Sequence, residues 1–273
     1  MLPDVLIALA IVASIGLLLG ILLALFIKFF GIEEDEKAKN IRACLPGINC
    51  GACGYKGCDD YAKALAEGSA KPNLCVPGAA ETSKQLSEIL GIEIPAPKDV
   101  VAFVHCNGVC GATTQKAVYD GMQSCRATSM LYGGPDACRF GCLGCGDCVS
   151  ACMSNAICIQ DGVARIDTRR CIGCGMCLVT CPKKLITMVP QETQAAVFCN
   201  NQDKGADARK ACKNACIGCK KCERACPHNA ITVVNNCAVI DYTKCTGCRE
   251  CVSGCPTGCL KAVFFPDLTE HPF

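Results

Sequence analysis

Residues 142–152 read CLGCGDCVSAC, and their cysteine spacing, C-x2-C-x2-C-x3-C, decides the fold. The same spacing returns in residues 171–181, 216–226 and 245–255. Adding 74 to ten of the eleven cysteine positions between 125 and 181 gives a cysteine, from Cys199 to Cys255. Self-similarity at a fixed period indicates duplication. We therefore interpret residues 125–198 and 199–273 as two copies of one unit.

Each run has the spacing of bacterial ferredoxins, in which three cysteines hold one [4Fe–4S] cluster and the fourth reaches the other cluster of a pair. Sulfur donors suit iron–sulfur chemistry or zinc, but structural zinc sites use separated knuckles rather than such a run. We therefore expect four [4Fe–4S] clusters. Their expected ligand sets are Cys142, Cys145, Cys148 and Cys181; Cys171, Cys174, Cys177 and Cys152; Cys216, Cys219, Cys222 and Cys255; and Cys245, Cys248, Cys251 and Cys226.

The stretch between the two runs of each unit predicts a hairpin. Residues 156–167 read AICIQ, the turn pair Asp161-Gly162, and VARID, and residues 230–241 repeat the pattern around Asn235-Asn236. Short alternating stretches around such turn residues are typical of β-hairpins. The expected fold class is thus α+β, with tandem ferredoxin folds.

Residues 44–90 predict a separate small module that holds one more cluster. Its candidate ligands are Cys50, Cys53, Cys58 and Cys75, set among glycines that let the backbone close tightly. This spacing fits iron–sulfur and zinc, and we favour iron–sulfur. Helices are expected at 59–67 and 82–90. A charged linker, 31–43, precedes the module, and 91–124 is a linker and strand region with extra cysteines.

The composition agrees with a structure held together by thiols. Cysteine provides 30 of 273 residues, about 11%, above the roughly 8–10% that signals a cysteine-defined scaffold. The chain has no Trp and only 5% aromatic residues, so metals or crosslinks must support a thin core. A net charge of +2 lacks the basic excess that nucleic-acid binding needs.

The N-terminal residues 1–30 predict a transmembrane anchor. Residues 5–27, VLIALAIVASIGLLLGILLALFI, carry no charge and are long enough to cross a hydrocarbon core of about 30 Å as a helix. The alternative, a cleaved signal peptide, would have a basic start and a shorter apolar run. Lys28, Lys37, Lys39 and Arg42 all follow the apolar run, so the positive-inside rule places the bulk of the chain in the cytoplasm. That compartment is reducing, which favours metal ligation over disulfides.

Ten cysteines remain outside these sets. Cys158, Cys237 and Cys259 lie in or beside apolar runs and are interpreted as buried free thiols. Cys106, Cys110, Cys125 and Cys138 are numerous enough for a sixth cluster, which we keep as a hypothesis. The roles of Cys44, Cys199 and Cys212 stay open.

The order of anchor, linker, NCGACGYKGC motif (residues 49–58) and ferredoxin repeats resembles the B subunit of the Rnf complex, an ion-translocating ferredoxin:NAD oxidoreductase of bacterial and some archaeal membranes. The doubled ferredoxin region is similar to the longer clostridial-type form. The resemblance implies an electron-relay subunit of the cell membrane, which takes electrons from reduced soluble ferredoxin and passes them to other membrane and peripheral subunits.

The chain itself shows no motif for other cofactors. It has no G-x-G-x-x-G after a strand, no P-loop and no C-x-x-C-H, so we expect no nucleotide or haem site and no complete active site. Two alternatives remain: a polyferredoxin subunit of another membrane oxidoreductase, and a tethered zinc-binding scaffold.

A basic stretch in the second unit is a candidate docking surface for an acidic ferredoxin. Its six positive residues stand against one acidic residue, Glu223: Arg209, Lys210, Lys213, Lys220, Lys221 and Arg224. Such a surface steers partners electrostatically. A solvated face that offsets the negative charge of bound clusters explains the same residues equally well.

Overall fold

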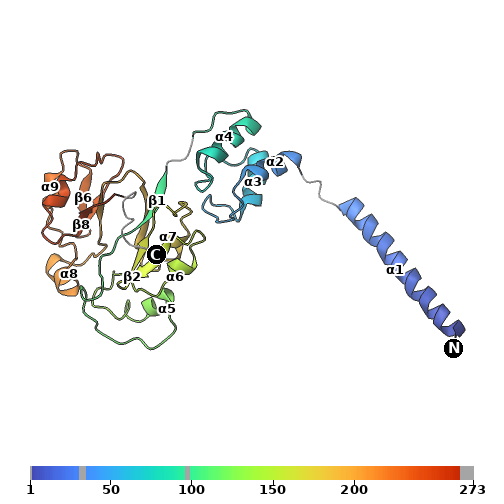
Figure 1. The fold of residues 1–273 in the computed structure, drawn as a ribbon, viewed down its shortest axis with the longest axis horizontal. Coiled ribbons are helices and arrows are strands. Elements are labelled where there is room, and N and C mark those ends of the chain that lie inside the picture. The colour runs from blue at the N-terminus through green and yellow to red at the C-terminus, as the bar shows by residue number, and fades with distance from the viewer. Residues whose placement is uncertain (1, 31–34, 96–98, 265–273) are drawn as a thin grey trace.

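The computed structural model describes residues 2–30, 35–95 and 99–264, which form one long helix, a helical module and two units of mixed helix and strand (Figure 1). Helix α1 covers Leu2–Phe30 and stands clear of the other elements in Figure 1. Every residue from 11 to 26 is exposed. Among the residues whose side chains the structure describes, no helix combines the length and the apolarity that crossing a bilayer requires.

Residues 35–95 form a small helical module. It consists of α2 (Glu36–Cys44), α3 (Cys58–Ala66) and α4 (Ala79–Leu90), so both expected helices are present. The side chains of Ile41, Tyr61 and Leu86 are at most 1% exposed and form the core between the three helices. Burial of such side chains is the main stabilising contribution in a module this small.

Helix α2 occupies most of the stretch 31–43, where the sequence suggested a linker; residues 31–34 lie outside the described part. Asp35 caps the helix by accepting a hydrogen bond from the backbone N–H of Lys37 at 2.9 Å. The helix forms because Ile41 reaches the core of the module, while Glu36, Lys37 and Lys39 face solvent.

The first ferredoxin-type unit has two antiparallel strand pairs. Strand β1 (Val100–Val104) pairs with β4 (Ile186–Pro190), and β2 (Ile157–Gln160) pairs with β3 (Val163–Ile166). The β2–β3 hairpin turns at Asp161-Gly162, as predicted, and both residues have positive φ. The helices are α5 (Cys125–Met130), α6 (Asp147–Ser150) and α7 (Met176–Thr180). Cys148 and Cys177 are buried with the apolar side chains of this core.

The second unit repeats this plan. Strand β5 (Ala195–Val197) pairs with β8 (Leu260–Ala262), and the predicted hairpin is β6 (Ile231–Val234) with β7 (Cys237–Ile240). Its helices are α8 (Gly205–Ala211), α9 (Lys221–Ala225) and α10 (Glu250–Ser253). Cys216, Cys222 and Cys251 are buried in its core, so in both units the cysteines are part of the packing.

The strand pairing moves the boundaries of the two units. Strand β1 belongs with the first unit and β5 with the second, so each unit begins before the residues at which the sequence repeat placed it. His105 donates its backbone N–H to the carbonyl of Leu185, and Phe198 donates its own to Cys259. The residues that follow, Cys106 and Cys199, therefore hold equivalent places.

The match of Cys125 with Cys199 at an offset of 74 is consequently not a structural equivalence. Cys125 begins α5, within the longer stretch of chain that separates Cys106 from Cys138. The offset of 74 holds where chain lengths are equal, as for β4 and β8. It fails where the first unit carries extra residues.

Candidate iron–sulfur centres

Two left-handed residues bend each cysteine run. The first precedes the second cysteine of a run and is always glycine: Gly144, Gly173, Gly218 and Gly247 have φ between +63° and +77°. A Cβ on Gly144 would lie 2.8 Å from the carbonyl oxygen of Gly162, so a side chain has no room there. The second follows the second cysteine, at Gly146, Gly175, Lys220 and Arg249, and a short helix starts directly after it. The leading cysteines of a run thereby curl round one space.

Cavities lie where three of the expected sets come together. One is lined by Cys50, Cys53, Cys58 and Cys75. A second is lined by Cys226, Cys245, Cys248 and Cys251. A third is lined by Cys216, Cys219, Cys222 and Cys255, together with Cys259. The structure thus gathers all four cysteines of each set, including residues far apart in the sequence.

The first site of the first unit departs from the expected set. Its cavity is lined by Cys142, Cys148 and Cys181 and also by Cys125, whereas the expected ligand Cys145 is not among the lining residues. Burial is the largest cause that raises the pKa of Cys145. The hydrogen bond with Thr128 lowers this pKa, and the nearby thiol of Cys125 raises it. The carboxylate of Asp147 fixes this arrangement, because it accepts the backbone N–H of Cys125 at 2.9 Å.

The remaining expected set also comes together. Burial, with smaller contributions from the nearby thiols of Cys171, Cys174 and Cys152, raises the pKa of Cys177 to about 12. Such mutual influence requires these sulfurs to be neighbours. The fourth cysteine of the preceding run therefore joins the three of the following run, as the ferredoxin spacing predicts.

Backbone N–H groups point at several of these sulfurs. Ala156 donates to Sγ of Cys152 at 3.2 Å, and Ala230 donates to Sγ of Cys226 at 3.4 Å. Hydrogen bonds to cysteine sulfur stabilise negative charge and raise the potential of a bound iron–sulfur cluster. The same donor is used at corresponding places of the two units.

The donor chemistry fits iron–sulfur clusters. Each set offers sulfur only, and burial raises the pKa of Cys148 to about 12 and that of Cys251 to about 11. Thiols of this kind give up their protons when a cation replaces them. In the described part of the chain, no three His, Cys, Asp or Glu side chains converge on the position of one metal ion. A [4Fe–4S] cluster instead takes one thiolate on each of four irons, so its ligands surround a cavity.

Neighbouring sites are close to one another. Cys50 of the module contributes to the raised pKa of Cys174, after burial and a backbone hydrogen bond. A Cβ on Gly173 would lie 3.1 Å from Cγ1 of Val76, so the module and the first unit are in contact there. Within the first unit, Cys177 contributes in the same way to the pKa of Cys148. The module site and the two sites of the first unit thus form a series.

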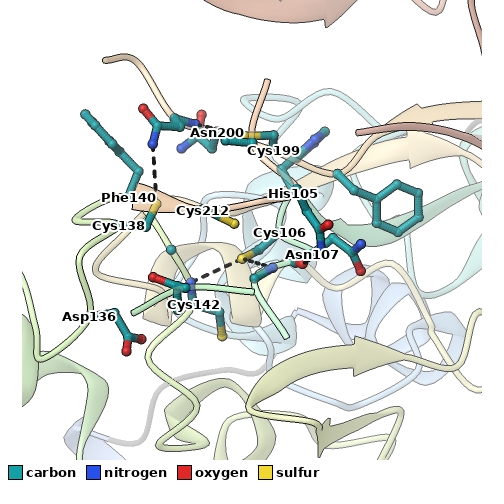
Figure 2. A pocket seen from close by; sticks show the side chains of 17 residues that line it. His105, Cys106, Asn107, Asp136, Cys138, Phe140, Cys142, Cys199, Asn200 and Cys212 are labelled. Atoms are coloured by element: carbon teal, nitrogen blue, oxygen red, sulfur yellow. Dashed lines mark hydrogen bonds between the residues drawn. The ribbon is translucent and has the colours of Figure 1, made fainter. Parts of the chain in front are cut away.

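The cysteines outside the five sets are distributed differently from the sequence hypothesis. Cys106 and Cys138 come together, but with Cys199 and Cys212 rather than with Cys110 and Cys125 (Figure 2). Cys110 is exposed, and Cys125 lies at the first site of the first unit. The sequence predicted that Cys158, Cys237 and Cys259 are buried free thiols. Cys237 and Cys259 are buried, whereas Cys158 is partly exposed. Cys44 donates to the carbonyl of Asn40 at 3.4 Å.

Cysteine-lined sites in series, on paired ferredoxin-type units, define an iron–sulfur electron-transfer protein of the polyferredoxin class. Family models agree. One described as "Putative Fe-S cluster" matches residues 45–77, and two described as "4Fe-4S dicluster domain" match residues 170–230 and 215–259.

Three relatives identify the family. The chain is 43% identical over 245 residues, 89% of its length and 74% of the relative's, to the B subunit of the Na(+)-translocating ferredoxin:NAD(+) oxidoreductase complex of Acetobacterium woodii. It is 43% identical, over 87% of its length and 84% of the relative's, to the B subunit of the corresponding proton-translocating complex of Clostridium ljungdahlii. The B subunit of an ion-translocating oxidoreductase complex from Methanosarcina acetivorans is 37% identical, over 76% of this chain and 78% of its own.

The chain belongs to this family, the B subunits of the ion-translocating ferredoxin:NAD oxidoreductase (Rnf) complexes, which confirms the resemblance seen in the sequence. It is therefore an electron-relay subunit of an oxidoreductase complex, with iron–sulfur domains.

Proposed function

We propose that this chain accepts electrons one at a time from reduced soluble ferredoxin and passes them, through at least five [4Fe–4S] clusters, to membrane partner subunits. The observation that carries the proposal is the proximity of successive sites. The module packs against the first unit where Val76 meets Gly173, beside the ligand Cys174, and Cys148 and Cys177 are buried in one core. When bound, a [4Fe–4S] cluster supplies one-electron transfer, and the protein sets its potential, order and spacing.

The proposed ligands are twenty cysteines. They are Cys50, Cys53, Cys58 and Cys75 in the module; Cys142, Cys145, Cys148, Cys152, Cys171, Cys174, Cys177 and Cys181 in the first unit; and Cys216, Cys219, Cys222, Cys226, Cys245, Cys248, Cys251 and Cys255 in the second. Their thiolates hold the irons, and the surrounding apolar side chains limit the access of water. Backbone donors such as Ala156 and Ala230 stabilise the negative charge at the sulfurs.

The basic face of the second unit supports ferredoxin docking there. Arg209, Lys210, Lys213, Lys220, Lys221 and Arg224 are all exposed. Lys220 and Lys221 also line the cavity of the site formed by Cys216, Cys219, Cys222 and Cys255. A negatively charged partner held at this face would bring its own cluster near that site. Electrons would then travel from the second unit through the first to the module.

Helix α1 is proposed as the single-pass anchor in the cell membrane, with the module and both units on the cytoplasmic side. Apolar side chains project from all of its faces, with Val12 68% and Leu17 70% exposed. A helix that is apolar on all sides is stable where lipid or protein surrounds it. The basic residues that follow it in the sequence favour this orientation.

Anaerobic stopped-flow reduction of the detergent-purified chain tests the relay. Mixing with reduced ferredoxin should bleach the visible thiolate-to-iron absorption, whereas mixing with oxidised ferredoxin should not. In a variant with Cys222→Ser and Cys251→Ser, which disrupts both sites of the proposed docking side, bleaching should slow at least tenfold. If dithionite bleaches the wild-type chain but reduced ferredoxin does not, the proposed electron donor is wrong.

A further inference from the structure

A cavity lies where the two ferredoxin-type units meet. Four cysteines line it without belonging to any of the five sets: Cys106, Cys138, Cys199 and Cys212. Figure 2 shows their sulfurs around one space, whereas the sulfur of Cys142, which belongs to the first site, points away from it. Each unit contributes two of the four cysteines.

The two units hold their first cysteine in the same way. Sγ of Cys106 accepts the backbone N–H of Gly108 at 3.3 Å and that of Cys142 at 3.4 Å. Sγ of Cys199 accepts the corresponding donors, Asn201 at 3.4 Å and Cys216 at 3.2 Å. Two N–H donors on one sulfur stabilise a thiolate, and the repeat of this arrangement in both units makes a chance encounter of free thiols a poor explanation.

The other pair, Cys138 and Cys212, is equally built into the interface. Asn201 is 1% exposed and donates from Nδ2 to Sγ of Cys138, across the two units, at 3.5 Å. Cys212 is 7% exposed, and both Cys138 and Cys199 contribute, after burial, to its raised pKa. Cys138 is thus close to Cys199 and Cys212, and Cys106 is close to Cys138.

Hydrogen bonds fix the two units together around this space. Thr113 donates from Oγ1 to the carbonyl of Ala211 at 2.9 Å, and Asn214 donates from Nδ2 to the carbonyl of Asn107 at 2.8 Å. Arg139 and Asp203 form an ion pair at 2.8 Å. His105 also lines the cavity, but Val197 O lies 2.7 Å from its Nδ1 and Thr187 Oγ1 lies 2.7 Å from its Nε2. Both ring nitrogens are engaged, so His105 is not available to a metal. The other metal-binding side chains that line the cavity are the cysteine thiols and the carboxylate of Asp136.

We propose that Cys106, Cys138, Cys199 and Cys212 bind a sixth [4Fe–4S] cluster, shared between the two ferredoxin-type units. The site resembles the other cysteine-lined sites, because four thiols from separate parts of the chain surround one space and backbone N–H groups point at their sulfurs. Four sulfur donors suit an iron–sulfur cluster, and a [4Fe–4S] cluster takes one thiolate on each of its four irons.

The position of this site gives it a role, which rests on the relay proposed above. Cys142 and Cys216, whose N–H groups donate into it, are each the first ligand of a neighbouring cluster. The sixth cluster therefore lies between the first sites of the two units. It would accept one electron from the cluster on one side and pass one electron to the cluster on the other side. The donor cluster is then oxidised by one electron and the acceptor cluster is reduced by one electron, with no bond made or broken.

Metal and sulfide analysis of the anaerobically purified full chain tests the binding without ferredoxin. Six clusters require about 24 Fe and as many sulfides per chain, against about 20 for five. A variant with Cys106→Ser and Cys212→Ser should lose about four Fe and four sulfides. The matched control, Cys110→Ser with Cys158→Ser, should lose no iron and no sulfide. If Cys110 were a ligand, as in the set suggested by the sequence, this control would lose a cluster too.

About 20 Fe in the wild-type chain, stoichiometric zinc, or unchanged iron in the Cys106/Cys212 variant would each overturn the assignment. If that variant fails to fold, the wild-type count alone decides between five and six clusters. A chain with about 24 Fe that ferredoxin does not reduce would refute the proposed donor while leaving the sixth cluster in place.

Discussion

The backbone N–H of Cys216 donates to Sγ of Cys199 at 3.2 Å, so a ligand of one proposed cluster is held directly against the sulfur of another. Cys142 and Cys106 repeat the relation in the first unit at 3.4 Å. Two ferredoxin-type units that would otherwise be separate modules are thereby joined through a shared centre. This connection between the cluster sites, and the loops that form each site, can be tested directly.

The glycine inside each cysteine run should be indispensable. Gly144→Ala places a left-handed alanine, which costs about 1–2 kcal/mol, and its Cβ would meet the carbonyl oxygen of Gly162. We expect faster release of about four Fe to a chelator under anaerobic conditions. The control is Gly254→Ala, at φ −84° with nothing within 4 Å of the new Cβ. Equal release from both variants would show that loop geometry does not limit cluster retention.

Cys125 should be able to replace Cys145 as a ligand of the first site. Because Cys125 lines the cavity and Cys145 does not, the single variant Cys145→Ser should keep its cluster. The double variant with Cys125→Ser should lose about four Fe. Iron analysis and visible absorption measure both. Loss of the cluster in Cys145→Ser alone would show that Cys125 cannot reach the iron.

Ferredoxin oxidation should depend on charge at the second unit. Replacing Lys220 and Lys221 by Glu should slow stopped-flow reduction about tenfold or more at low salt and far less at high salt, because electrostatic steering is screened. Lys63→Glu with Lys84→Glu changes the charge equally on exposed positions of the module and should have little effect. The same salt dependence in both variants would favour a solvated face over a docking surface.

Membrane attachment should depend on α1. Expressed without its partner subunits, the chain should sediment with membranes, and a chain lacking residues 1–34 should remain in the supernatant with its full iron content. Leu18→Arg, which costs about 2.5–3.5 kcal/mol at a helix centre in a bilayer, should weaken attachment. Membrane association of the truncated chain on its own would assign the attachment to another surface.

Most of the grouping of cysteines into sites could be predicted from their spacing in the sequence. In the set of Cys171, Cys174, Cys177 and Cys152, local turns place three thiols, and the approximate symmetry within a unit supplies the fourth, so the pattern alone predicts the grouping. Helices α3 and α4 and both hairpins follow from short-range periodicity and turn residues in the same way.

Features that depend on tertiary contacts could not be found from the pattern. Cys199 and Cys212 meet Cys106 and Cys138 only because the two units dock, and no local spacing reports docking. The extra residues before Cys138 also gave Cys125 a false match to Cys199. Helix α2 was not predicted because its charged residues suggested a linker. In the structure the single buried residue Ile41 packs the helix against the core of the module.

The most direct test of the account is ferredoxin-driven reduction followed by electron paramagnetic resonance, with integration of the reduced-cluster signal. In the wild-type chain we expect electrons to reach clusters of both units and the module. With Cys106→Ser and Cys212→Ser, reduction should stop at about two spins, those of the second unit. If the variant's remaining clusters were all reduced at the wild-type rate, the path would not pass through the shared centre.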